Sequence, residues 1–171
     1  VTECLLHLNE VRALAVAPAE IEIAIWFHDA IYDPQADDNE ERSAEWGAEV
    51  LRGAGCMEAS IRAVHSLVLA TKSHRPETED EALLVDIDLG ILGAAPHAFE
   101  RYDAQIGLEY EWVPLDQYRR ARRAVLCRFL ERAVIYQTEF FPDRLDTQAR
   151  RNPMTEGARR KASMSPTVCC S

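Results

Sequence analysis

The sequence lacks the short motifs that mark several large enzyme classes. None of GxGxxG, GxxxxGK[ST], GxSxG or HExxH occurs among its 171 residues, so dinucleotide-binding, P-loop, serine-hydrolase and zincin sites have no support. Alternating apolar and polar runs of strand length are also missing, and almost every periodic segment repeats at helical spacing. The sequence therefore predicts an all-α protein whose chemistry comes from other residues.

Long apolar runs and an excess of positive charge are missing as well. No run approaches the roughly 20 residues that cross a bilayer, and no signal-peptide pattern is visible. The formal net charge is −10, which opposes sequence-independent nucleic-acid binding because such binding neutralises phosphates with Lys and Arg. We expect neither a membrane nor a nucleic acid as a partner.

The five cysteines show no framework spacing. They are odd in number and form no CxxC or CxxH pair, which favours free thiols in a reducing cytoplasm. A chain of this length suits one domain. We expect that domain over residues 1–155 and, because periodicity is lost after Glu156, a disordered tail over 156–171. Since the chain opens inside a helical pattern, we also expect residues upstream of Val1.

Apolar periodicity predicts helices over most of the domain. The expected ranges are 2–16, 19–31, 39–52, 60–74, 83–92, 96–110, 116–141 and 143–151, with an acidic loop over 77–80 and a break at Pro142. The range 19–31 is apolar nearly all round after Glu22, which predicts the central buried helix.

His28 and Asp29 stand side by side inside that apolar helix. Burying ionisable groups is unfavourable unless something compensates them. A divalent metal ion compensates both, because imidazole nitrogen and carboxylate oxygen are metal ligands. Alternatively, the two side chains satisfy each other and the nearby backbone, or they stand at an exposed helix end.

Two aspartates in the helix expected over 83–92 offer a further carboxylate. Two positions on a helix correspond to about 200° of rotation, so only one of Asp86 and Asp88 faces the interior. Asp88 has large aliphatic residues one turn away on either side. This predicts that Asp88 is the more buried carboxylate and the better metal ligand. Alternatively, both aspartates cap or solvate a short helix.

Two histidines share the helix expected over 60–74. Their nine-residue spacing rotates about 900°, half a turn out of phase, so at most one of them faces a shared site. His74 lies at the helix end, the better place for a site, whereas a structural role is favoured for His65. The arginine-rich segment over 119–123 favours a solvated helix face; the alternative is one arginine turned inward toward an anionic substrate group.

Together these residues resemble the HD-domain superfamily of metal-dependent phosphohydrolases. The segments that carry the resemblance are WFHDAIY (26–32), DNEERSA (38–44), ATKSH (70–74), DIDLGILG (86–93) and, near the end, Tyr136, Ala149, Arg150 and Asn152. They look like one subgroup of predicted bacterial metal-dependent hydrolases. The similarity covers about residues 1–156.

The resemblance implies an all-α, HD-domain-like helical bundle that holds a divalent metal ion, with Mn, Mg, Zn, Fe, Co and Ni as candidates. The implied ligands are His28, Asp29 and Asp88. The resemblance also implies that His74 is a further ligand or a substrate contact and that Glu40 either supports a metal ligand or orients water.

The implied activity is hydrolysis of a small phosphorylated metabolite, such as a nucleotide, in the cytoplasm, by a monomer or a homodimer. The family's first metal histidine falls in a segment upstream of Val1, and His7 lies on the helix that follows it. The resemblance therefore ties activity to that upstream segment. The alternative is a non-catalytic module of the same fold that binds a nucleotide or a protein partner.

Overall fold

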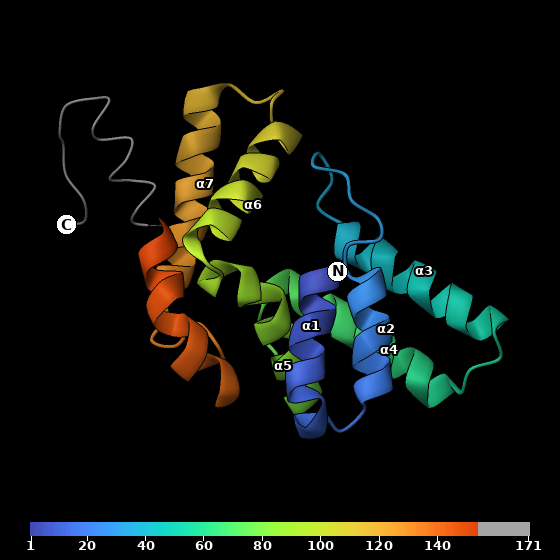
Figure 1. The fold of residues 1–171 in the computed structure, drawn as a ribbon. Coiled ribbons are helices and arrows are strands. Elements are labelled where there is room, and N and C mark those ends of the chain that lie inside the picture. Colours follow the sequence, from blue (N-terminus) through green and yellow to red (C-terminus); the bar gives the residue numbers. More distant parts are fainter. Residues whose placement is uncertain (154–171) are drawn as a thin grey trace. The chain divides into compact units, whose positions relative to one another are not determined.

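The computed structural model describes residues 1–153 and contains only helices and turns over that range (Figure 1). The elements are α1 (Thr2–Val11), η1 (Arg12–Leu14), α2 (Pro18–Phe27), α3 (Asn39–Gly53), α4 (Glu58–Ser73), α5 (Glu79–Asp88), η2 (Leu89–Gly93), α6 (Pro96–Glu109), α7 (Leu115–Leu130) and η3 (Pro142–Asp146). The all-α prediction is confirmed. The tail predicted over 156–171 lies outside the described residues.

The chain groups into two compact units. Unit 1 comprises Val1–Gly90 and Tyr136–Phe141, and unit 2 comprises Ile91–Ile135 and the chain from Pro142 onward. The single domain expected over 1–155 stays a prediction.

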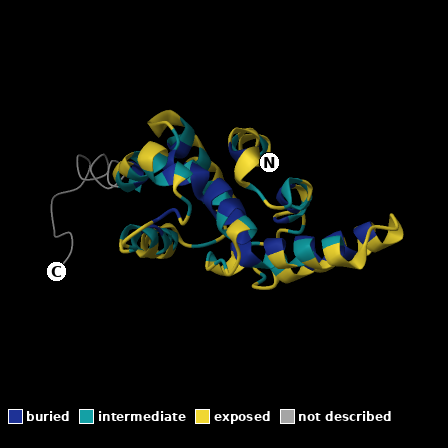
Figure 2. Cartoon of the chain, turned by 90° about the horizontal axis from the view of Figure 1, so that it is seen from below, coloured by how far each residue is buried: buried dark blue, intermediate teal, exposed yellow. Residues whose placement is uncertain are grey.

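Unit 1 is built from two helical hairpins and a buried helix. α1 lies beside α2, and α3 lies beside α4, while α4 also contacts α2 and α5 (Figure 1). Helices in the chain carry a buried face and an exposed face (Figure 2). The central buried helix is α5, whose residues 83–87 are all buried. The sequence-based choice of 19–31 is therefore wrong, since Trp26 on α2 is 58% exposed.

Several helix ends differ from the predicted ones. α2 ends at Phe27, so His28 is its C-cap and Asp29 lies in the turn that follows. α5 begins at Glu79 because Thr78 and Glu81 form a capping box, which satisfies two backbone amides. The second half of the predicted acidic loop, residues 79 and 80, is therefore helical.

The C-terminal helices also divide at other places. α7 ends at Leu130, so Tyr136 lies beyond it and belongs to unit 1. Pro142 does not break a helix but lies in the first turn of one that covers 140–153 and includes the π-turn η3. A proline is tolerated there because the first turn of a helix has no partner for its amide hydrogens.

Asp86 fastens the returning segment Tyr136–Phe141 to α5 within unit 1. Its buried carboxylate accepts hydrogen bonds from the backbone N–H groups of Gln137 and Thr138 and from the Thr138 hydroxyl, each at 2.7 Å. The Tyr136 hydroxyl donates to the carbonyl of Leu89 at 3.3 Å. A buried carboxylate is compensated when several donors reach it. These hydrogen bonds therefore hold the segment Tyr136–Phe141 against α5.

Unit 2 is held by contacts between polar side chains and backbone. Nδ2 of Asn152 donates to the carbonyls of Leu92 and Ala94, both at 2.8 Å. Arg150 donates to the carbonyl of Leu130 at the end of α7. Both residues belong to the segments that carry the family resemblance, and their contacts here stabilise the unit.

Two further predictions have a structural outcome. Within residues 1–153, no single helix has the length and apolar composition of a membrane span. Only the bent pair Glu79–Gly93 and Pro96–Glu109 has that length and composition when its two helices are taken together. Cys4, Cys56 and Cys127 are free thiols, as predicted. Cys169 and Cys170 lie outside the described residues.

Candidate metal centre

His28 lies between two carboxylates where α2 ends. Its Nε2 is 3.3 Å from Oδ2 of Asp29 and 3.5 Å from Oδ1 of Asp88. The other oxygen of Asp88, Oδ2, is 3.4 Å from Nε2 of His74. The structure thus brings together the three predicted metal ligands and His74.

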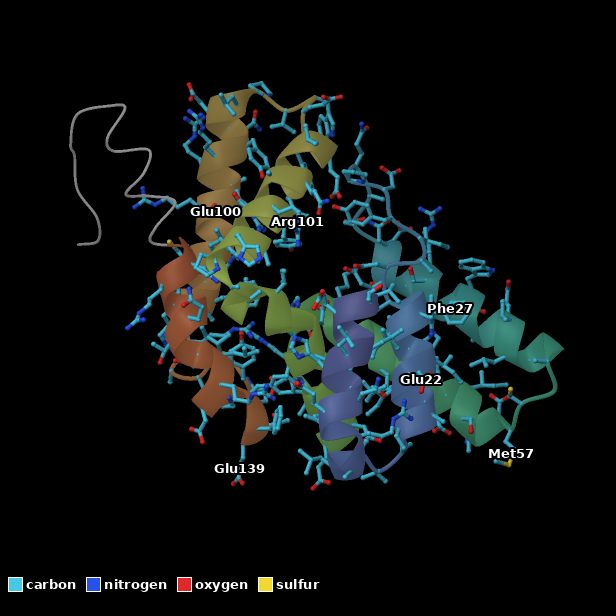
Figure 3. All side chains as sticks on the ribbon, in the orientation of Figure 1. Glu22, Phe27, Met57, Glu100, Arg101 and Glu139 are labelled. Atoms are coloured by element: carbon cyan, nitrogen blue, oxygen red, sulfur yellow. The ribbon has the colours of Figure 1, made fainter. Side chains whose placement is uncertain are left out.

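The C-terminal ends of three helices place these side chains. α2 ends at Phe27, which Figure 3 labels, α4 ends at Ser73 and α5 ends at Asp88. The last carbonyls of a helix have no intrahelical partner and carry partial negative charge. Helix ends and carboxylates therefore add to one electrostatic effect, which favours a cation.

The backbone fixes the orientation of the His28 ring. Nδ1 is 2.9 Å from the carbonyl oxygen of Ile25, and the ring is buried, with 6% exposure. A carbonyl only accepts, so Nδ1 carries a proton and Nε2 faces the carboxylates. Metal-binding histidines are commonly oriented by such a bond on the nitrogen that does not bind the metal.

Without a metal, the pair His28–Asp88 is an ion pair. Burial lowers the pKa of His28, but hydrogen bonds with Asp29 and Asp88 outweigh burial and raise this pKa to about 11. Burial raises the pKa of Asp88, but His28 and His74 hold it well below its usual range. His28 is therefore an imidazolium at neutral pH and must lose a proton before Nε2 can bind a metal.

His74 has an unusual backbone. Its φ of 51° and ψ of 40° lie in the left-handed region, and within residues 1–153 it is the only non-glycine residue with positive φ. Glycine is the favoured residue where a helix ends in this conformation. Strain at such a position supports the hypothesis of a function for the side chain, and this side chain lies 3.4 Å from Asp88.

Replacing His74 by Gly should separate that function from stability. Glycine removes the left-handed strain, and the lost contact with Asp88 is partly exposed and contributes little. We expect the free energy of unfolding of the metal-free protein to stay unchanged or rise by up to about 1 kcal/mol, while manganese affinity falls about tenfold or more. Urea unfolding and manganese titration of wild type, His74→Gly and the control His65→Gln measure both effects. A loss of stability with unchanged affinity would contradict the functional role.

Asp88 rather than Asp86 faces His28, in agreement with the rotation argument. The expectation that Asp88 is the more buried of the two is wrong, because Asp86 is 0% exposed while the Asp88 side chain is 26% exposed. The reason is that both faces of α5 are covered. Asp86 points to the segment over 136–141, whereas Asp88 lies at the helix end.

The other predicted residues lie elsewhere. Glu40 is in the first turn of α3 and partly buried; its side chain makes no hydrogen bond or ion pair within residues 1–153, although its charge contributes to raising the pKa of Lys72, so its role stays a prediction. His65 Nε2 lies 4.0 Å from a carboxylate oxygen of Glu45 on α3. His7 packs so closely on Gly90 that a Cβ there would lie 2.9 Å from its ring.

The inward arginine is also present, in unit 2. Arg122 has a side chain that is 15% exposed, and its Nε donates to Oδ1 of Asp103 at 2.8 Å, whereas Arg119, Arg120 and Arg123 are exposed. The solvated helix face is thus confirmed for its neighbours. Arg122 itself pairs with a carboxylate of the protein.

Cys4 on α1 is a neighbour of the site that sequence reasoning missed. Burial raises the pKa of its thiol, and the charge of Asp88 raises it further. The thiol is therefore protonated at neutral pH. Its spacing of four residues from the buried Leu8 was the available signal, because such residues share a helix face.

The donor pairs suit a divalent ion in chemistry and separation. Two ligands at 2.0–2.2 Å from a tetrahedral ion lie about 3.4 Å apart, close to the three separations in the site, whereas charge-assisted hydrogen bonds are typically about 2.7–2.9 Å long. Over the described residues, however, no group of three or more His, Cys, Asp and Glu side chains has the arrangement of a metal site. Each pair of donors therefore has a separation that suits a metal ion, whereas the donors as a set do not have the arrangement of a metal site.

Comparison with known proteins adds no relative. No protein-family model matches the chain, and searches of curated proteins and of solved structures found no match. The resemblance to HD-domain hydrolases thus rests on the sequence segments given above and stays a prediction.

Proposed function

We propose that this chain is a metal-dependent hydrolase of the HD type that acts on a small phosphorylated metabolite, such as a nucleotide, in the bacterial cytoplasm. His28, Asp29 and Asp88 would hold the ion, with His74 as a further ligand or a substrate contact. The observation that carries the proposal is the His28 ring, held through Nδ1 by Ile25 while Nε2 faces two carboxylates at 3.3 and 3.5 Å.

Each residue has a distinct task in this proposal. A divalent ion supplies a Lewis acid for a phosphoryl oxygen and makes water more acidic. Asp88 would neutralise part of the charge of the ion and, through its second oxygen, position His74. The His74 side chain is 22% exposed and so accessible to substrate. Glu40 would orient the attacking water.

The alternative is a helical module without catalytic activity. Two observations favour it: in the metal-free protein His28 already compensates Asp29 and Asp88 as an imidazolium, and the described residues contain no arrangement of three metal donors. In that case the cation that the three helix ends and the carboxylates favour is the protonated His28 side chain itself.

Manganese titration distinguishes the two functions. Because the pKa of His28 is raised to about 11, binding at pH 7 should release about one proton per metal ion, and affinity should rise with pH between 6.5 and 8.5. Calorimetry in buffers of different ionisation enthalpy measures the released proton. His28→Gln should abolish binding, and the matched control His65→Gln should retain it.

Activity is tested on the same variants. Phosphate release from a panel of nucleotides and sugar phosphates should require manganese and disappear in His28→Gln but not in His65→Gln. Absence of metal binding at millimolar manganese, both in this chain and in one that carries the upstream segment which the resemblance implies, would favour the non-catalytic module.

A further inference from the structure

A cavity of about 650 Å³ opens in unit 2 where α6 turns into α7. All its lining residues lie between Asp103 and Tyr118, so unit 2 forms it alone. The volume falls within the range of small-molecule sites, about 300–1,000 Å³. None of the residues proposed to hold the metal ion lines this cavity.

Residues of α6 and α7 contribute to the lining of the cavity. Asp103, which is 5% exposed, lines it and binds Nε of Arg122, whose guanidinium lies 5.5 Å from the centre of the Tyr102 ring. Arg122 therefore neutralises this buried carboxylate. Gly107 also lines the cavity, and a Cβ there would lie 3.6 Å from the Tyr118 hydroxyl and 3.9 Å from the nearest ring carbons, which are ordinary contact distances.

Aromatic rings form one wall of the cavity. Tyr110 stacks on Trp112 and on Tyr118, with ring centres 6.2 and 6.1 Å apart and planes inclined by 30° and 28°. Trp112 is nevertheless 55% exposed. The face of an aromatic ring carries negative potential and attracts a cation, most strongly at Trp.

The charged side chain that lines this cavity beside the aromatic rings is also negative. Glu111 lines the cavity and is exposed, and its carboxylate makes no hydrogen bond or ion pair within residues 1–153. The lining contains no Lys, Arg or His. After Arg122 has neutralised Asp103, one negative charge remains beside the ring faces, which disfavours an anionic ligand.

We propose that this cavity binds a small organic cation of the quaternary or tertiary ammonium class. Stacked rings would contact the apolar surface of the cation, and Glu111 would supply the countercharge. Apolar residues over 113–115 complete the wall. A hydrated inorganic cation fits less well, because it would gain little from apolar and aromatic surface.

Choline and its neutral analogue 3,3-dimethylbutan-1-ol test the class of ligand. The two molecules share a shape, but carbon replaces the charged nitrogen in the alcohol. Calorimetric titration of the full chain should show choline binding at least about tenfold tighter than the alcohol, since a desolvated cation–π contact and a countercharge both act on the charge. Equal affinities, or no choline binding up to 10 mM, would overturn the proposal.

Variants locate the binding. Trp112→Leu and Glu111→Gln should each weaken choline binding about five- to tenfold, and Gly107→Leu should abolish it by filling the cavity. Glu109→Gln is the matched control, since Glu109 is exposed on α6 and outside the lining. Thermal melting checks that each variant is folded. Choline binding that survives in Trp112→Leu and Gly107→Leu would place it elsewhere and overturn the assignment.

Discussion

Replacing Asp86 by Ala is expected to lower the free energy of unfolding by about 3 kcal/mol, because buried hydrogen-bond donors are then left without an acceptor. The donors are the backbone amides of Gln137 and Thr138 and the Thr138 hydroxyl. The alanine side chain cannot accept from them, and water reaches a buried site poorly. Urea unfolding of wild type and Asp86→Ala measures the loss.

Asp80 provides the matched control for this prediction. It also accepts two backbone amides, from Val16 and Ala17, each at 2.8 Å, but the bond with Val16 is exposed. Water can replace much of that carboxylate, so we expect Asp80→Ala to cost about 1 kcal/mol. Equal losses in the two variants would show that burial does not determine the cost.

Asp86 also shows where prediction from sequence reached its limit. Rotation about a helix axis is a local property, and it predicted which aspartate faces His28. Burial of Asp86 depends on Gln137, which lies 51 residues downstream, and no periodic pattern contains that contact. For the same reason the long helix expected over 116–141 was wrong, since Tyr136 leaves α7 to pack in unit 1.

The candidate site was predictable to a similar extent. Side-chain chemistry identified His28, Asp29 and Asp88 as potential ligands, and the structure brings them together. The left-handed backbone of His74 is a property of one residue's torsion angles, which helix periodicity does not report. The aromatic cavity in unit 2 escaped for another reason: its Trp112 lies in a turn, where apolar spacing has no period.

Replacing Asp88 by Ala is expected to remove metal binding, with an affinity loss of at least about 100-fold, since changes around metal ligands alone cost 10–100-fold. In wild type, millimolar manganese should raise the melting temperature, because a ligand that binds only the folded state stabilises it. In Asp88→Ala it should leave that temperature unchanged. Asp88→Asn keeps the shape without the charge and should behave almost like Asp88→Ala.

In the metal-free protein, the ion pair between His28 and Asp88 makes the free energy of unfolding depend on pH. The pKa of Asp88 is held low in the folded state, so its carboxylate contributes stability above the unfolded pKa of about 3.9 and loses it as pH falls. The pKa of His28 is raised to about 11, so its contribution is full below about 6.5 and declines as pH rises toward 11. The ion pair therefore stabilises most between about pH 4 and 6.5.

Urea unfolding across pH distinguishes an ion-pair role for Asp88 from a merely structural one. Near pH 5.5 the difference between wild type and metal-free Asp88→Ala should be about 2 kcal/mol, the order expected for a hydrogen bond to a charged group. The difference should shrink at pH 3, where the stabilising contribution of the Asp88 carboxylate is partly lost. It should shrink again at pH 9.5, where the contribution of the His28 imidazolium is partly lost. A difference that stays constant over this range, together with manganese affinity within threefold of wild type, would make Asp88 a structural residue. The non-catalytic module would then be the better function for this chain.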